Sequence, residues 1–582
     1  MLMRSLFICL LGLGFVAFAQ AKDLEICEQG IPVTTDSLSH PVIGRGGMVA
    51  AQEHLAAQVG ADILARGGNA IDAAVATGFA MAVTHPQAGN LGGGGFMLVS
   101  LEGEDAVIAI DFRETAPASA HRDMYLNADG DVDTQRGRFS HLSAGVPGTV
   151  MGLLEALETY GTMNRREVIG PAIRLADRGI AMAQGQAQSF EDYRERLSQD
   201  PSSKAYFLAH GAGYKRGDRF VQKDLAATLR RIRDKGADDF YKGRTAELIV
   251  AEMEAQGGAI THADLENYTV VTRKAIKGHY KNHDVYSMPP PSSGGVHVIQ
   301  MLNILSGYDL QSDGHNSAAY IHKVAESMRR AFADRSKYLG DPDFFDVPTD
   351  AITDMSYAEH LRASIDLQAA SPSATVAPAS QLPHESHETT HYSVIDAKGN
   401  AVAVTYTLNF SYGSGMSVDG AGFLLNNEMD DFSAKPGSPN GYGLIGGEAN
   451  KIEPGKRPLS SMTPVIVKKD GVPVLVTGSP GGSTIITAVL QMVLNVLEWE
   501  MNLADATQAA RIHHQWLPDV LRLEPSISPD TEARLQAMGH VTSRETLYGT
   551  TLGRVNSVGA RCQVQLGMAD LRDPKAAAIG VD

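Results

Sequence analysis

The stretch that decides the fold is Thr389-Thr390-His391-Tyr392-Ser393-Val394-Ile395-Asp396, continued after two residues by Gly399-Asn400-Ala401-Val402-Ala403-Val404-Thr405-Tyr406-Thr407-Leu408-Asn409. Strand-forming residues dominate both parts, and residues 396–400 between them have the composition of a turn. The pattern predicts two strands, His391–Ile395 and Ala401–Leu408, around that turn. Residues 371–388 in front are rich in Ser, Pro, Ala and His and have no helical period, which is typical of an exposed connector.

The connector leads directly into a strand that begins with two threonines, and this junction suggests a threonine nucleophile. A Thr hydroxyl is a weak nucleophile unless a base lies beside it, and a free α-amino group on the same residue is one such base. The pKa of an α-amino group is about 8, so much of it is neutral at working pH. A cut between Glu388 and Thr389 would create this arrangement. The alternative is that Thr389 and Thr390 are ordinary strand residues, because Thr is common in strands.

Three further motifs follow in the chain: Leu424-Leu425-Asn426-Asn427-Glu428-Met429-Asp430-Asp431-Phe432, Lys456-Arg457-Pro458-Leu459-Ser460-Ser461-Met462-Thr463-Pro464 and Thr477-Gly478-Ser479-Pro480-Gly481-Gly482-Ser483. Together with residues 389–409, they closely resemble the γ-glutamyltransferase (γ-glutamyltranspeptidase) family of N-terminal-nucleophile hydrolases. The resemblance covers nearly the whole chain after its first residues, and its motifs are long and mostly without gaps.

The resemblance implies an α/β fold, the four-layer αββα sandwich of N-terminal-nucleophile hydrolases, built from two chains cut from one precursor. Autocatalytic cleavage is then expected between Glu388 and Thr389. The expected division of the chain is a signal peptide at 1–21, a large subunit at 22–388 and a small subunit at 389–582 that begins with the nucleophile. The two subunits would form a heterodimer.

The resemblance also implies roles for individual residues. Thr389 is the expected nucleophile, the Thr407 hydroxyl bonds to it, and the backbone amides of Gly481 and Gly482 hold the oxyanion. The α-ammonium and α-carboxylate of a glutamyl donor need partners of opposite charge. The expected ammonium-binding residues are Glu428 and Asp431, and the carboxylate-binding residues are Arg113, Ser460 and Ser461. Asn409 helps to orient this end of the donor, and Tyr442 covers it as part of a lid at residues 435–447.

Some of these roles have independent support from residue chemistry. The guanidinium of Arg113 is a rigid fork of donors suited to a carboxylate, although without the resemblance a local ion pair with Asp111 or Glu114 is the favoured interpretation. The glycines at 481 and 482 precede an apolar helix predicted at 485–497, and amides beside a helix start can stabilise an oxyanion. Taken singly, the acids would be solvated or capping residues, and the serine pair would be a turn.

The expected function is therefore that of an exported γ-glutamyltransferase/hydrolase. It would cleave the γ-glutamyl amide of glutathione and related compounds through an acyl-enzyme on Thr389. The glutamyl group would pass to water or to amines of amino acids and dipeptides, without a cofactor or a metal. Three alternatives stay open: a cephalosporin (glutaryl) acylase, a γ-polyglutamate transpeptidase, and an uncleaved exported binding protein.

The first residues and the composition bear on location and partners. Arg4, the apolar run at 6–18 and a small-x-small site ending at Ala19 or Ala21 predict a signal peptide, with an uncleaved anchor as the alternative. A periplasmic or secreted protein is expected. The net charge of −17 argues against nucleic acid or an anionic membrane as partner. Cys27 and Cys562 would remain after leader removal, either as a disulfide or as two thiols.

The rest of the chain predicts alternating helices and strands. Residues 48–66 and 70–83 have the alanine-rich and apolar patterns of helices, and the second of these is expected to be buried. Strands are predicted at 96–101 and 106–112, and a hairpin at 463–477. Residues 145–370 are expected to be mainly helical. Histidines 384, 387, 391, 513 and 514 have no recognisable metal-ligand spacing.

Overall fold

The computed structural model describes residues 37–208, 213–376, 389–435, 437–546, 551–561 and 564–582. The expected signal peptide, Glu388, Cys27 and Cys562 lie outside the described residues. Among the helices of the described ranges, none combines the length and the hydrophobicity needed to cross a membrane.

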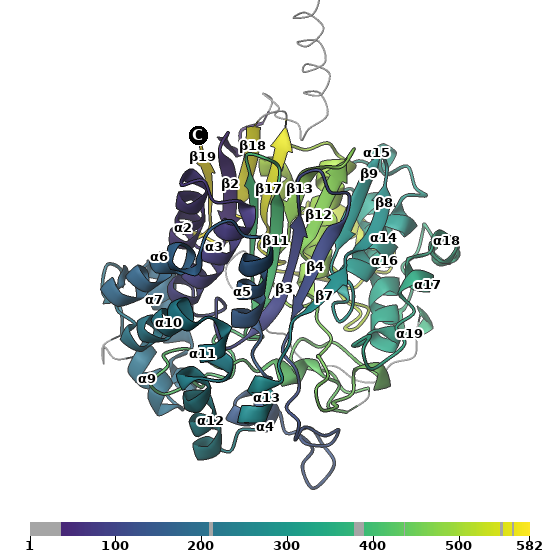
Figure 1. Ribbon diagram of the computed structural model, residues 1–582. Helices are drawn as coiled ribbons and strands as arrows, with labels where there is room; N and C mark the ends of the chain where they lie inside the picture. The colour runs from purple at the N-terminus through teal and green to yellow at the C-terminus, as the bar shows by residue number, and fades with distance from the viewer. Residues whose placement is uncertain (1–36, 209–212, 377–388, 436, 547–550, 562–563) are drawn as a thin grey trace, which may run out of the picture.

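Two seven-stranded sheets form the centre of the molecule (Figure 1). The first sheet has the order β19 (Ala577–Val581), β2 (Gly47–Ala51), β10 (Thr390–Asp396), β11 (Ala401–Thr407), β3 (Gly94–Ser100), β4 (Val107–Phe112) and β7 (Val271–Lys274). The second has the order β1 (Val42–Gly44), β18 (Val564–Ala569), β17 (Asn556–Arg561), β13 (Val472–Thr477), β12 (Val465–Lys469), β9 (His283–Ser287) and β8 (Ile276–Tyr280). All their pairings are antiparallel.

Helices cover the outer face of each sheet, so the layers are helix, sheet, sheet, helix (Figure 1). The first sheet is covered by α2 (His54–Ala65), α3 (Ala70–Thr84) and α5 (Thr149–Tyr160), and the same hydrophobic core extends to α6 (Arg165–Arg178), α10 (Lys223–Lys235) and α12 (Arg244–Gln256), which pack on other helices. The second is covered by α14 (Gly294–Leu305), α16 (Ala318–Tyr338) and α20 (Thr484–Leu497), against which α18 (Met355–Ala363), α21 (Leu503–Gln508) and α22 (Pro529–Ala537) pack. The expected four-layer αββα sandwich is confirmed.

Smaller elements surround these layers. A short mixed sheet contains β14 (Ile512–His513), β15 (Leu521–Leu523) and β16 (Thr542–Arg544), in which β15 pairs antiparallel with β14 and parallel with β16. A two-stranded antiparallel sheet pairs β5 (Ile180–Ala181) with β6 (Arg219–Phe220). Short helices include α4 (Thr134–Arg138), α7 (Gln184–Asp192), α8 (Arg194–Leu197), α9 (Pro201–Phe207), α11 (Ala237–Tyr241), α13 (His262–Glu266), α15 (Leu310–Asp313), α17 (Thr349–Thr353) and α19 (Ser373–Val376).

Side-chain alternation explains how one strand serves two hydrophobic layers. On β2, Met48 and Ala50 face the core between the sheets, whereas Val49 and Ala51 face the helices. This follows from the two-residue period of a strand, since both faces of the sheet are covered. Every residue of β2, β10 and β11 is buried, so these strands lie at the centre of the fold.

The predicted hairpin at the start of the chain's last third is confirmed. Strands β10 and β11 pair with each other from Thr390–Tyr406 to Ile395–Ala401. The hairpin predicted at 463–477 is also confirmed as β12 and β13, and Asp470 and Gly471 at its turn both have positive φ.

Two predictions about local structure are wrong in part. Residues 48–51 belong to β2 and not to a helix, because they pair with both β10 and β19 and the helix begins only at His54. The first part of the expected exposed connector contains α19, where the Ser373 side chain is buried and donates to the Trp516 carbonyl. Residues 377–388 lie outside the described residues.

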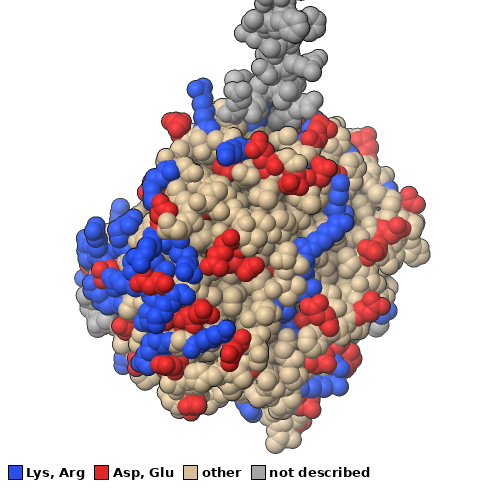
Figure 2. Space-filling view, viewed as in Figure 1, with Lys and Arg blue, Asp and Glu red and all other residues tan. Residues whose placement is uncertain are grey.

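Charged helix surfaces are mixed in sign. In Figure 2, Lys and Arg gather over the region of α6 and α10, with acidic side chains among them. Arg166 and Arg233 both pair with Asp234, and Lys223 and Arg230 both pair with Asp177. These helix faces are therefore solvated surface with local ion pairs.

Candidate active site

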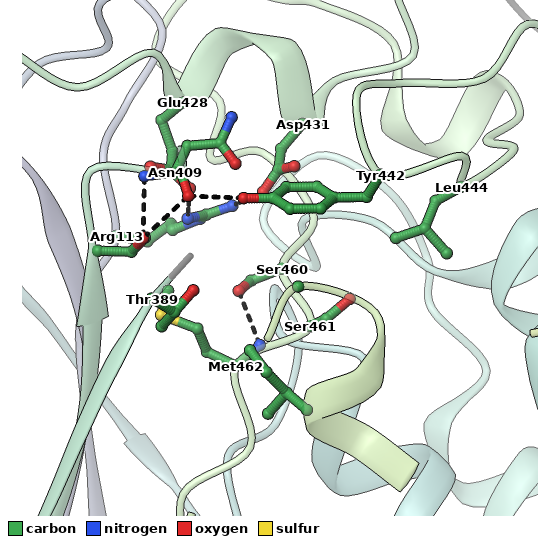
Figure 3. A pocket seen from close by; sticks show the side chains of 13 residues that line it. Arg113, Thr389, Asn409, Glu428, Asp431, Tyr442, Leu444, Ser460, Ser461 and Met462 are labelled. Carbon is green, nitrogen blue, oxygen red and sulfur yellow. Dashed lines mark hydrogen bonds and ion pairs between the residues drawn. The ribbon is translucent and has the colours of Figure 1, made fainter. Parts of the chain in front are cut away.

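One pocket brings together almost all of the residues singled out from the sequence. Its lining includes ten of them: Arg113, Thr389, Thr407, Asn409, Glu428, Asp431, Tyr442, Ser460, Ser461 and Gly482. Of the other two, Gly481 lies next to Gly482 but does not itself line the pocket, and Glu388 lies outside the described residues. Figure 3 shows Thr389 and the serine pair facing a group formed by Arg113, Asn409, Glu428 and Asp431.

The central hairpin sets the position of the two threonines. Thr389 comes directly before β10, and Thr407 is the last residue of β11. Since Thr390 pairs with Tyr406, the two threonines lie at the same end of the hairpin, and both face the pocket. Thr389 is 3% exposed, so its hydroxyl lies in a site largely shielded from bulk water.

A buried arginine forms the charged end of the pocket. The guanidinium of Arg113, just after β4, donates to Glu428 and to Asp431, and its Nε donates to the Pro458 carbonyl at 3.2 Å. Glu114 adds a third carboxylate, 3.7 Å from Nη1 of Arg113. The local ion pair weighed for Arg113 therefore exists, but its two bonded partners are the expected ammonium-binding acids, which are more than 300 positions away in the sequence.

Three buried carboxyl groups surround one guanidinium, so their full ionisation would give an excess of negative charge. Burial raises the pKa of Glu428 well above its ordinary value and, less strongly, that of Asp431, although Arg113 opposes both shifts. Burial also raises the pKa of Glu114 to about 7. Neither carboxylate oxygen of Glu114 has a hydrogen-bond partner among the described residues, so its charged form is poorly stabilised. A cation that entered here would relieve this excess.

Asn409 and Tyr442 enclose this end of the pocket. Asn409 has a φ of 78°, a conformation that Asn adopts more readily than most residues, and its side-chain amide donates to the Asn427 carbonyl at 2.9 Å. The Tyr442 hydroxyl donates to the Asn409 carbonyl at 2.6 Å. Tyr442 is 4% exposed, so the aromatic residue of the expected lid lies inside the structure and over the pocket.

The glycine pair lies directly before α20. Gly481 and Gly482 both have positive φ, and a Cβ at Gly482 would lie 2.5 Å from the Tyr442 ring, so this position requires glycine. Within the described ranges, neither glycine amide donates to a protein acceptor. Both are thus available as donors at the start of a helix, where the helix dipole favours negative charge.

Comparison with known proteins agrees with this geometry. The family model for gamma-glutamyltranspeptidase matches residues 56–580. The chain belongs to the gamma-glutamyltranspeptidase family. It is 52% identical to the glutathione hydrolase proenzyme of Escherichia coli (strain K12) over 517 residues, which is 89% of each chain.

Two solved structures show the same fold. The cephalosporin acylase from Bacillus halodurans has a TM-score of 0.82 and 26% identity, covering 94% of this chain and all of that one. The gamma-glutamyltranspeptidase of Helicobacter pylori has a TM-score of 0.56 and 44% identity, covering 60% of this chain and 97% of that one. The recognised family and the expected fold are confirmed, and the chain is an enzyme of the gamma-glutamyltranspeptidase family.

Several residues in and around the pocket were given no role in the site from the sequence. Leu444, Met462 and Ile485 add apolar contacts to the lining. Glu114 reaches Arg113, and Arg335 on α16 reaches Ser461. Glu114 had a signal in the sequence, its adjacency to Arg113, but Arg335 had none, because only the fold brings α16 against the loop at 460–461.

No metal or cofactor was expected, and the pocket lining offers no His or Cys. In the part of the chain that the structure describes, His322, Glu326 and His540 come close enough to share an ion, as do His141, Asp200 and Glu252. Glu326 is already paired with Arg329 and Arg330, whose positive charges disfavour a cation there. Neither group contributes to the pocket.

Glu114→Gln is expected to stabilise the ligand-free protein at alkaline pH. A carboxyl whose folded pKa is raised binds more protons in the folded than in the unfolded state, so its contribution to stability falls as pH rises from about 4.5 to about 7. Glutamine does not titrate, so the variant does not lose stability in this way as pH rises. Its melting temperature should therefore exceed that of the wild type by roughly 2 to 3 °C more at pH 8 than at pH 5. A difference independent of pH, measured by differential scanning calorimetry, would contradict a raised pKa.

Proposed function

We propose that this enzyme cleaves the γ-glutamyl amide of glutathione and related donors, with Thr389 as its nucleophile. The observation that carries this proposal is the charge pattern of the pocket. Glu428 and Asp431 bracket Arg113, and the serine pair lies beside them, so cationic and anionic partners stand together within one small cavity that Thr389 also lines.

A donor's α-amino acid group matches this pattern. Its ammonium would pair with Glu428 and Asp431, and its carboxylate would accept from Arg113, Ser460 and Ser461. The ion pairs of Arg113 with Glu428 and Asp431 would thus be exchanged for ion pairs with the donor. Because the donor's ammonium and carboxylate cancel, the net charge of the pocket would stay the same. Binding at both poles would direct the γ-carbonyl toward Thr389, because the side chain of glutamate has a fixed reach.

The proposed reaction has two steps. The Thr389 amine, free after cleavage of the chain, takes the hydroxyl proton while Oγ1 attacks the γ-carbonyl carbon, and the amide nitrogen leaves as a protonated amine. The Thr407 hydroxyl supports the nucleophile, and the amides of Gly481 and Gly482 hold the oxyanion. Water or an acceptor amine then attacks the ester carbon, and the α-amine of Thr389 takes the attacker's proton. The ester bond to Oγ1 breaks, and this proton passes to Oγ1, which restores the Thr389 hydroxyl.

Maturation follows from the same assignment. We propose cleavage between Glu388 and Thr389 into subunits of residues 22–388 and 389–582, after export and removal of residues 1–21. Both sheets contain strands from both sides of this cut: β10 pairs with β2 and β11 with β3 in the first sheet, and β18 pairs with β1 and β12 with β9 in the second. Separation of the subunits would break both sheets, so they should stay together as a heterodimer.

The charge pattern is tested by comparing two chromogenic donors. γ-Glutamyl-4-nitroanilide carries the α-ammonium and α-carboxylate, and glutaryl-4-nitroanilide lacks the ammonium. We expect kcat/KM to be at least about 100-fold higher for the γ-glutamyl compound, because the acids would otherwise remain unpaired by the donor. Equal or higher turnover of the glutaryl compound would favour the alternative of a cephalosporin (glutaryl) acylase.

Acceptor use should depend on pH. Only a deprotonated amine attacks the acyl-enzyme, and α-amines titrate at about 8, so raising pH from 7 to about 9 increases the reactive fraction several-fold. Water gains no comparable fraction. With γ-glutamyl-4-nitroanilide and glycylglycine, γ-glutamyl-glycylglycine should therefore overtake free glutamate as the medium becomes alkaline. Glutamate as the sole product at pH 9 and high acceptor concentration would show a dedicated hydrolase.

A further inference from the structure

We propose that Arg335 is a positioning residue for the donor's α-carboxylate, which it serves by fixing the Ser461 hydroxyl as a donor and by adding a second positive charge. This inference rests on the proposed function, since it concerns recognition of the same donor. It adds to the site a residue that does not itself line the pocket.

The fold brings Arg335 behind the serine pair. Arg335 lies in the last turn of α16 and is 5% exposed. Its Nε donates to Ser293 Oγ at 3.0 Å and its Nη2 donates to Ser461 Oγ at 3.2 Å. Ser293 in turn donates from Oγ and from its backbone amide to the Ser460 carbonyl, both at 2.8 Å. One guanidinium is therefore linked to both serines.

The direction of these hydrogen bonds decides what the serines can offer. A guanidinium can only donate, so the Ser461 hydroxyl accepts from Arg335 and its own proton must point elsewhere. Ser460 Oγ likewise accepts from the Met462 amide at 3.0 Å. Both serines line the pocket, and each hydroxyl oxygen already accepts a hydrogen bond from a protein N–H group. They are thereby set as donors, as recognition of a carboxylate requires.

The charge of Arg335 is the second part of the argument. In the described ranges, Arg335 forms no ion pair, unlike Arg329 and Arg330 on the same helix, which both pair with Glu326. Burial lowers the pKa of Arg335 to about 10, against the attraction of Asp431, so the guanidinium stays charged at neutral pH. A buried cation without an ion-pair partner is costly, and an anionic ligand bound at Ser461 would offset this cost.

The test compares donors with and without the carboxylate. In Arg335→Met, KM for γ-glutamyl-4-nitroanilide should rise about 10-fold or more with kcat within about twofold, because hydrogen bonds to charged groups typically give such factors. For 4-aminobutyryl-4-nitroanilide, which keeps the amine and lacks the α-carboxylate, kcat/KM should stay within about twofold of wild type. An equal loss for both donors, or an unchanged KM, would overturn the proposal and show that Arg335 is only structural.

Two further variants sharpen the test. Arg335→Lys retains the charge with one donor atom and should raise KM for γ-glutamyl-4-nitroanilide by about 3-fold. This variant replaces Arg335→Met in the test if the methionine protein does not fold. Equal effects of Arg335→Lys on both donors would again overturn the proposal. In the Ser461→Ala background, Arg335→Met should have a smaller effect than in the wild type, since it acts partly through that hydroxyl. Full additivity would exclude this route.

The outcomes also separate this inference from the proposed function. If the wild type fails to cleave γ-glutamyl-4-nitroanilide, the proposed function itself is wrong, and the inference falls with it. If the wild type cleaves it and Arg335→Met shows no selective rise in KM, only the role of Arg335 is wrong.

Discussion

Thr389→Ala should give a single uncut polypeptide without turnover of γ-glutamyl-4-nitroanilide. The substitution removes the hydroxyl proposed both to cleave the chain and to attack the donor, so maturation and catalysis should fail together. Loss of a nucleophile costs about 10⁴-fold or more in kcat in other hydrolases. A denaturing gel reports the cleavage, and release of 4-nitroaniline reports the turnover.

Thr389→Ser is the matched variant, because it retains a hydroxyl and an amine at the same position. It should still be cut into two bands and should retain measurable turnover. Amino-terminal sequencing of the smaller wild-type band should begin Thr-Thr-His-Tyr. A different start, or a Thr389→Ala protein that is cut and active, would remove Thr389 from its proposed role.

The hairpin and the pocket could largely be predicted from the sequence because their signals are local. Alternating β-branched residues specified β10 and β11, and the linear motifs at 424–432 and 456–464 each supply neighbouring pocket residues. The prediction of a helix at residues 48–51 was wrong for a physical reason. The sequence Met-Val-Ala-Ala fits a helix by propensity. It forms β2 because it pairs with β10 and β19, two strands that lie more than 300 residues later in the chain and that no local pattern reveals.

The charge balance of the pocket was beyond the reach of sequence reasoning. The motifs named Arg113, Glu428 and Asp431 but not their mutual ion pairs, which require burial and long-range packing. The donor direction of the Ser461 hydroxyl depends on Arg335, about 125 residues earlier in the chain, and no local pattern encodes that contact. Contacts of this kind, between a pocket residue and a residue outside the pocket, arise from the packing of α16 against a loop. They can be identified only in the folded structure.

Arg113→Lys should raise KM for γ-glutamyl-4-nitroanilide by roughly 10- to 100-fold while kcat changes by only a few-fold. A lysine retains the charge but cannot reach Glu428, Asp431 and the Pro458 carbonyl at once, so it loses the fork that would hold the donor's carboxylate. Removal of an interaction made equally in the ground state and the transition state affects KM more than kcat. Steady-state kinetics on the cleaved protein measures both.

Arg273→Lys is the matched control for this substitution. Arg273 on β7 also forms a forked ion pair, to Asp111 and Asp343, but it does not line the pocket. It should lose a comparable amount of local bonding, yet leave KM for the donor within about twofold of wild type. If both variants shift KM equally, the effect comes from general loosening around β4. If Arg113→Lys leaves KM unchanged, Arg113 is a structural ion-pair residue, and the carboxylate must be held by other groups in the pocket.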